Sequence, residues 1–299
     1  MKKLLLGALS ILLVGFLTSC QDNINPVDSG ITIAEDEVAF ILAEDAIGSE
    51  ITASTFAGHM APLTKSNVVR YFPHVNFPDC AEVTVSGTEF PKEITIDFGD
   101  ECMTRNGRLR SGIIYITISD QMTNAGAEYS VIYEDVVFGN RAIEKVATWV
   151  NQGQNEDGNW VVAHQTDCSV TYGDSVRIAR SYSGEKEWID GFLSPEFTDN
   201  KFYRTGGGTI TVNDDLVFER TIIEPLYIDR ACRFILGGVV EISRNDETMT
   251  IDFGDGVSCD NIAVVTKDGV SEEIELTTGK FKNRFERFRK NMRKRNGWW

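Results

Sequence analysis

The feature that most constrains the fold of this chain is a period-two alternation of apolar and polar residues, which recurs from about residue 80 onward. Segments rich in β-branched and aromatic residues show it at 82–86, 94–98, 113–118 and 209–212. Successive side chains of a β-strand point to opposite faces, so this pattern predicts strands with one buried face. No long helical periodicity alternates with these segments, which argues against a parallel α/β sheet. The sequence therefore predicts a mainly β protein, built as an antiparallel meander or sandwich.

Turn-forming dipeptides separate the predicted strands at mostly hairpin-scale intervals. Gly, Asn and Asp tolerate the backbone angles that tight turns require. We expect turns at Asn106-Gly107, Asp157-Gly158, Gly173-Asp174, Ser183-Gly184, Asn213-Asp214 and Asp268-Gly269.

An internal repeat organises the body of the chain. The six residues Thr-Ile-Asp-Phe-Gly-Asp occur at 95–100 and again at 250–255. We interpret the two copies as parts of two related β-modules, at 34–150 and 151–279, which either form separate sheets or join in one continuous sheet. The first module begins with a short predicted helix over 34–47, where good helix formers follow a run of acidic residues and Val38, Ile41 and Leu42 share one face.

Cysteines bracket both copies of the repeat. This arrangement predicts the disulfides Cys80–Cys102 and Cys232–Cys259, each clipping one hairpin, because thiols of exported proteins tend to oxidise. Cys168 is then left over. We interpret it as a buried free thiol, with exchange of partners or an intermolecular bridge as alternatives. A metal site built on His164 and Cys168 lacks further ligands at a known spacing.

Aspartates cluster at the two repeated turns. In such a turn the carboxylate hydrogen-bonds the backbone and the glycine takes a positive φ, which is a sufficient structural reason for the motif. The alternative is a Ca²⁺ site, because hard cations prefer several carboxylate and carbonyl oxygens. The candidate ligands are Asp97, Asp100, Asp252, Asp255 and Asp260. No other cofactor is expected.

The first twenty residues are typical of an export signal. Two lysines precede an apolar run from Leu4 to Leu17, which is too short to span a bilayer. The run ends in Leu-Thr-Ser-Cys20, which resembles a bacterial lipobox. The resemblance implies a signal peptide at 1–19, cleavage before Cys20 and acylation of that cysteine, followed by a tether over 20–33. An ordinary signal with an incidental cysteine is the alternative. Gln21 stands where an Asp would favour retention in the inner membrane, which implies the outer membrane with its facing side left open.

The charge is unevenly distributed along the chain. The formal net charge is -16, yet residues 20–279 carry 44 acidic against 18 basic residues, whereas 280–299 carry one acidic and nine basic residues. An acidic body repels phosphate and is a poor partner for nucleic acid.

The basic tail over 280–299 combines these cations with an apolar stripe. It is typical of an amphipathic helix that lies on anionic lipid or lipopolysaccharide. A solvated tail, or one folded back on the acidic body, is the alternative. The candidate membrane-surface residues are Phe281, Phe285, Phe288, Trp298 and Trp299.

Two family resemblances follow from these motifs. Residues 251–256, Ile-Asp-Phe-Gly-Asp-Gly, are similar to the turn of PKD-type extracellular β-sandwich modules, with Ile in place of the Trp of that motif. The chain more closely resembles uncharacterised lipoproteins of Gram-negative bacteria, in which a lipobox precedes Cys-bracketed Ile-Asp-Phe-Gly-Asp segments. This resemblance covers most of residues 31–279 and implies no particular activity.

The sequence contains no Gly-x-Ser-x-Gly, His-Glu-x-x-His, Cys-x-x-Cys or phosphate-loop motif. We therefore expect a lipid-anchored, non-catalytic binding or structural module of the cell envelope. The alternatives are a periplasmic carrier or chaperone for an apolar ligand and, with less support, a carboxylate-based glycan hydrolase. Trp149, Trp160 and Trp188 are candidates for stacking on sugars, although a core position suits each of them better.

Overall fold

The computed structural model describes residues 79–276, with gaps at 87–88, 104–106, 108, 173–175, 195–196, 233 and 245. Several predictions therefore concern residues outside the described part of the chain. They are the signal peptide, the acylation of Cys20, the tether, the helix over 34–47 and the basic tail with Phe281, Phe285, Phe288, Trp298 and Trp299.

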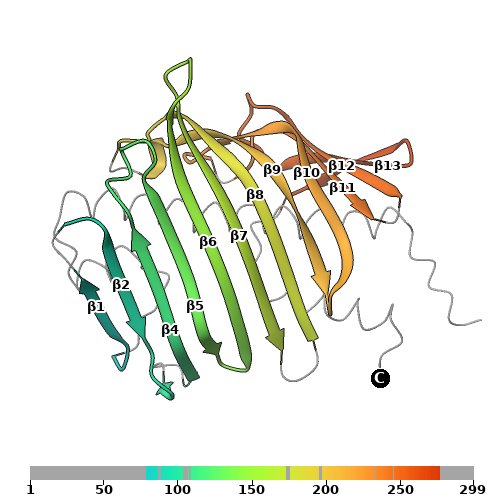
Figure 1. Ribbon diagram of the computed structural model, residues 1–299. Coiled ribbons are helices and arrows are strands. Elements are labelled where there is room, and N and C mark those ends of the chain that lie inside the picture. The colour runs from blue at the N-terminus through green and yellow to red at the C-terminus, as the bar shows by residue number, and fades with distance from the viewer. Residues whose placement is uncertain are drawn as a thin grey trace, which may run out of the picture.

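The described strands form a single antiparallel sheet of fourteen strands (Figure 1). Their order in the sheet follows the sequence from β1 to β14, except that the short β3 pairs only with β4. The elements are β1 (Glu82–Ser86), β2 (Lys92–Asp97), β3 (Cys102–Met103), β4 (Leu109–Ile118), β5 (Glu128–Phe138), β6 (Arg141–Gln154), β7 (Trp160–Tyr172), β8 (Val176–Asp190), the 3-10 helix η1 (Phe197–Asp199), β9 (Lys201–Val212), β10 (Asp215–Asp229), β11 (Gly237–Arg244), β12 (Glu247–Asp255), β13 (Ile262–Lys267) and β14 (Val270–Glu275).

This topology confirms the mainly β class. Each long strand pairs with its neighbours in sequence, which is a meander. A second sheet packed on the first, as a sandwich would require, is not found among the described strands. In Figure 1 strands β11 to β13 run in a different direction from β4 to β8, because the twist accumulates across the sheet.

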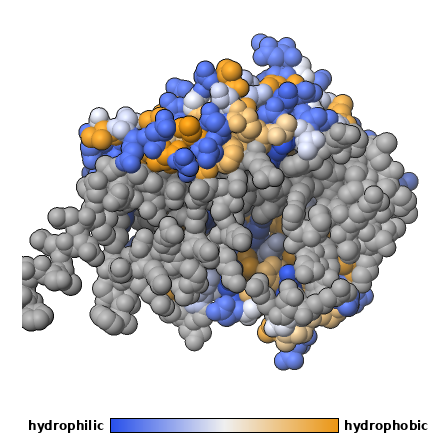
Figure 2. Space-filling view, turned by 180° about the vertical axis from the view of Figure 1, so that it is seen from behind, coloured by the Kyte–Doolittle hydropathy of each residue, from blue (hydrophilic) through white to orange (hydrophobic). Residues whose placement is uncertain are grey.

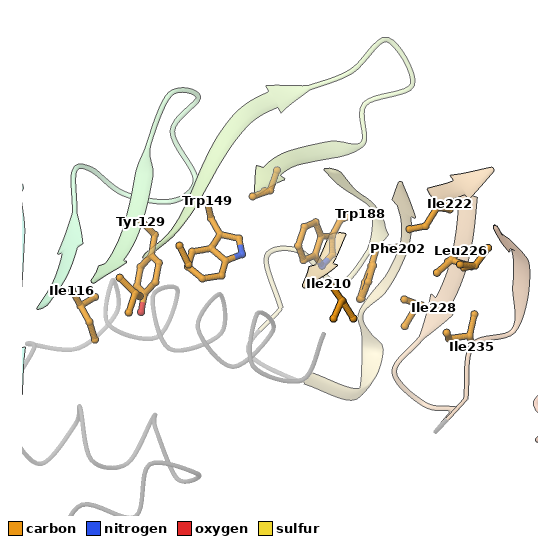
Figure 3. Packing of buried hydrophobic residues seen from close by; sticks show 14 of the residues in the cluster. Ile116, Tyr129, Trp149, Trp188, Phe202, Ile210, Ile222, Leu226, Ile228 and Ile235 are labelled. Atoms are coloured by element: carbon orange, nitrogen blue, oxygen red, sulfur yellow. The ribbon is translucent and has the colours of Figure 1, made fainter. Parts of the chain in front are cut away.

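The apolar core lies on one face of the sheet. Period-two alternation places Ile94 and Ile96 of β2 and Ile251 of β12 on this face, each at most 2% exposed. Figure 3 shows side chains from β4 to β10, with the neighbouring Ile235, projecting to the same side. In Figure 2, the view from behind, hydrophilic and hydrophobic side chains interleave along the described rim of the sheet. The strands are thus half-buried, as their sequence alternation predicts.

Three predicted turns are confirmed and one is wrong. Asp157-Gly158, Asn213-Asp214 and Asp268-Gly269 each join two consecutive strands. Asn106 and 173–174 fall in the gaps. Ser183-Gly184, in contrast, lies in the middle of β8.

Gly184 serves a close approach of two strands rather than a turn. It pairs with Gly206 of β9, and a Cβ atom on Gly184 would overlap the carbonyl oxygen of Thr205. Gly206 has a φ of 115°, and a Cβ there would overlap the Ser183 carbonyl oxygen and the Cα of Gly184. The glycine pair therefore allows β8 and β9 to approach each other more closely than side chains would permit.

Both predicted disulfides are present. Cys80 is bonded to Cys102, and Cys232 to Cys259, across 22 and 27 residues of sequence. Each bridge closes a segment that contains one hairpin, β1–β2 or β11–β12. Cys168 belongs to neither bridge and is half-buried on β7. The two disulfides therefore lie near opposite ends of the sheet.

We predict that Gly206→Ala destabilises the protein by about 3 kcal/mol or more, because the new Cβ meets backbone atoms that cannot move independently. Gly158→Ala is the matched control. Gly158 also has a positive φ, of 81°, but a Cβ there would meet no atom within 4 Å, so its cost is about 1 kcal/mol. Urea unfolding of both variants measures the difference. Equal destabilisation would show that the close approach of β8 and β9 is unimportant.

Removal of the Cys80–Cys102 disulfide, by Cys80→Ala together with Cys102→Ala, is predicted to lower the free energy of unfolding by roughly 3 kcal/mol. The reason is that this disulfide restricts a loop of 22 residues in the unfolded chain. Cys168→Ala is the control, and we expect a change of about 1 kcal/mol or less. Denaturant unfolding under non-reducing conditions tests both. An unchanged midpoint in the double variant would contradict the prediction.

Candidate functional site

A cleft with a volume of about 890 Å³ opens over β6 to β12, on the face of the sheet opposite to the core. Strands β8, β9 and β10 supply its middle, and the turn at the end of β12 supplies one wall. The side chains that decide its chemistry are Glu185, Glu187, Tyr203, Glu224, Tyr227 and Asp255.

Strand alternation explains why these side chains face the cleft. Lys186 and Trp188 of β8 point into the core, so Glu185 and Glu187 between and beside them point outward. On β9 the buried residue is Phe202, and its neighbour Tyr203 points outward. Polar and apolar residues therefore sort onto opposite faces of the same strands.

Strand register then brings the outward side chains together. Glu187 lies directly opposite Tyr203, Tyr203 lies opposite Tyr227, and Tyr227 lies opposite Gly237. The ring centroids of Tyr203 and Tyr227 are 5.4 Å apart, with their planes tilted by 39°. This pairing creates a two-tyrosine platform beside a carboxylate.

An irregularity in β10 hollows the surface. The pairing of β10 shifts register between Ile222 and Leu226, at Glu224 and Pro225, both of which line the cleft. Glycines lie beneath the platform, and a Cβ on Gly256 would approach the Tyr227 ring to 3.1 Å. The irregular strand therefore hollows the surface, and the missing side chain of Gly256 makes room for the Tyr227 ring.

Glu187 is the most firmly held carboxylate of the cleft. Its Oε1 accepts hydrogen bonds from the side-chain amides of Asn155 and Asn159, both at 2.7 Å. The turn that carries these amides is itself ordered, because the Asn155 Oδ1 accepts hydrogen bonds from the backbone of Asp157 and Asn159. Glu187 is therefore held in one orientation at the cleft by neutral donors.

The second repeated turn contributes to the cleft through Asp255, whereas the first does not line it. The turns lie in β2 and β12, with strands β4 to β11 between them, so the structure does not bring the two groups of aspartates together. Asp97 and Asp252 each accept a hydrogen bond from a glycine amide two residues later, at 2.6 and 2.8 Å.

Two of the three remaining aspartates, Asp255 and Asp260, fit the same account. The backbone amide two residues later donates to Asp255 at 3.1 Å and to Asp260 at 3.0 Å, while Asp100 is exposed. Within the described part of the chain no group of three or more His, Cys, Asp or Glu residues is placed to hold a metal ion. The turn-forming role of these carboxylates thus accounts for their spacing.

The tryptophans that were candidates for sugar stacking pack with the core instead. Trp149 and Trp188 are buried, at 8% and 4% exposure. Trp160 is partly buried and stacks on Phe192, with ring centroids 4.9 Å apart. Tyr203 and Tyr227 of the cleft were not predicted from the sequence as site residues. Their outward positions nevertheless follow from the alternation of side chains along β9 and β10.

A group of buried cations on the core face was likewise not predicted from the sequence. Lys186 and Arg204 lie directly opposite each other on β8 and β9, at 3% and 0% exposure, and Arg220 of β10 is 4% exposed. The guanidinium groups of Arg204 and Arg220 lie 4.5 and 4.6 Å from the centroid of the Tyr182 ring. Arg204 Nε also donates to the Tyr182 hydroxyl at 3.1 Å, and that hydroxyl donates to the Thr205 carbonyl at 2.7 Å. Tyr182 thus organises this cluster through cation–π contacts and hydrogen bonds.

Three tyrosines and one glutamate of β4, β5 and β6 have shifted pKa values. Burial raises the pKa of Tyr133 to about 12 and raises that of the buried Tyr129 further. A hydrogen bond to Glu134 raises the pKa of Tyr115. Hydrogen bonds from Ser169 and Arg177 lower the pKa of Glu144. These shifts reflect packing and surface pairing within the sheet.

No helix in the described part of the chain is both long and apolar enough to cross a membrane. Comparisons with protein-family models, with curated proteins and with solved structures find no match to this chain.

Proposed function

We propose that this protein is a lipid-anchored, non-catalytic binding module of the bacterial outer membrane, and that its cleft holds a saccharide. The observation that carries the binding role is the Tyr203–Tyr227 platform, set beside the oriented carboxylate of Glu187. The lipobox-like sequence ending at Cys20 supports the anchor.

The chemistry of the cleft suits a sugar. The C–H faces of a pyranose ring pack on aromatic rings, and its hydroxyl groups donate to carboxylates. Tyr203, at 39% exposure, is accessible for such packing. The cleft volume of about 890 Å³ lies within the usual range for small-molecule sites, about 300–1,000 Å³.

The proposed architecture includes the two related modules. In both copies of the repeat the glycine, Gly99 or Gly254, has a positive φ and its backbone amide donates to the aspartate two residues earlier. Both copies also neighbour a disulfide. These shared features support the duplication of one ancestral unit, a β-hairpin closed by a disulfide. The basic tail over 280–299 would add an electrostatic contact with anionic lipid to the acyl anchor.

Cys20→Ala is predicted to move the protein from the membrane fraction to the soluble envelope fraction, because acylation of this thiol supplies most of the membrane affinity. Fractionation of cells that express the full chain, with Cys168→Ala as the control, measures this. A Cys20→Ala protein that remains membrane-bound would refute the acyl anchor.

Tyr203→Ala and Tyr227→Ala are each predicted to weaken saccharide binding by about tenfold, equal to about 1.4 kcal/mol, because each removes one ring of the platform. Tyr115→Ala is the control, since Tyr115 is 37% exposed on β4 and does not line the cleft. A glycan array followed by calorimetry on the best ligand measures the effect. Analysis of the recovered ligand should show no cleavage. Loss of binding in all three variants, or in none, would contradict the assignment.

A further inference from the structure

The charge of the cleft narrows the class of saccharide that it accepts. We propose that the ligand is an amino sugar chain with free, protonated amines. This inference rests on the proposed saccharide-binding function and adds the charge of the ligand to it.

Carboxylates surround the tyrosine platform from three elements. Glu185 and Glu187 come from β8, Glu224 from the irregular part of β10, and Asp255 from the end of β12. The described residues that line the cleft include no lysine, arginine or histidine. The cations of β8, β9 and β10, Lys186, Arg204 and Arg220, point to the opposite face. The sheet therefore separates charge, with acids on the cleft side and buried cations on the core side.

The hydrogen bonds within the cleft leave its negative charge in place. The two amides that donate to Glu187 are neutral, so they orient its carboxylate without balancing it. The Asp255 carboxylate accepts a bond from the backbone amide of Val257, which is also neutral. Negative charges gathered in a concave site make the local electrostatic potential more negative, which attracts cations and repels uronates and phosphates.

The tyrosines and the carboxylates together select for a sugar that carries amines. A protonated amine gains from carboxylates and from the faces of aromatic rings. A simple polyamine would bring its amines to the carboxylates and to the ring faces but has no sugar ring to pack on the platform, whereas a neutral sugar would pack on the platform but carries no charge for the carboxylates. An amino sugar uses both features, which is why we assign this ligand class.

The test compares two oligosaccharides of equal length, a β-1,4-linked glucosamine oligomer and its fully N-acetylated counterpart. Calorimetry on the mature full-length protein is carried out at mildly acidic pH, where the amines are protonated and glutamates are ionised. We expect the glucosamine oligomer to bind about tenfold more tightly, or about 1.4 kcal/mol, and added salt to reduce this difference.

Glu185→Gln combined with Glu224→Gln should reduce the preference for the glucosamine oligomer to about threefold or less, because two of the four carboxylates that line the cleft lose their charge. Both residues are exposed at the cleft, so the substitutions should be tolerated by the fold. Glu219→Gln is the matched control, because Glu219 is an exposed residue of β10 that does not line the cleft. This variant should keep the full preference.

The outcomes separate the inference from the proposed function. Equal binding of the two oligomers would overturn the amine preference and leave saccharide binding intact. Binding of neither oligomer would overturn both. Spermidine binding as tight as that of the glucosamine oligomer would also overturn both, because the sugar rings would then contribute nothing.

Discussion

The register of one long antiparallel ladder is the constraint on which the whole structure depends. Strands β6 to β10 are 12 to 15 residues long and pair along most of their length. One face of this ladder is the core and the other carries the cleft. A slip of one residue would exchange the two faces, burying Glu187 and exposing Trp188. The burial of apolar side chains on one side therefore holds the surface of the cleft in place on the other, so the stability of the sheet and the proposed binding function share a single determinant.

The shape of the cleft depends on departures from a regular sheet. The Gly184–Gly206 pair lets two central strands approach closely, and the shift at Glu224 and Pro225 bends the next strand. A flat, regular sheet would present Tyr203 and its neighbours as a level surface. The irregular backbone turns that surface into a hollow. The two disulfides restrict the chain near the two ends of the sheet.

Much of the fold could be predicted from local patterns. Alternation located the strands, and the repeated Thr-Ile-Asp-Phe-Gly-Asp segment led to both disulfide pairs. The failures have identifiable physical causes. Ser183-Gly184 has the composition of a turn, yet Gly184 is required by its close pairing with Gly206 of the neighbouring strand β9. No local signal distinguishes a glycine that forms a turn from one that allows two strands to approach. Arg204 and Lys186 share the core face with Phe202 and Trp188, two residues away on the same strands. The general preference of charged residues for solvent gives no hint of these buried positions.

By itself the sequence determined the β class, the two faces of most strands and the cysteine pairing, because alternation and the repeat are encoded over short stretches of chain. Tertiary structure alone decided that the described strands form one continuous sheet, and that residues from β8, β10 and β12 meet around two tyrosines. These features depend on the register between strands and on the bending of β10, both of which arise from contacts between residues distant in sequence. Composition cannot report such contacts, since the same outward-facing acids would be solvated surface groups on a sheet with a different register.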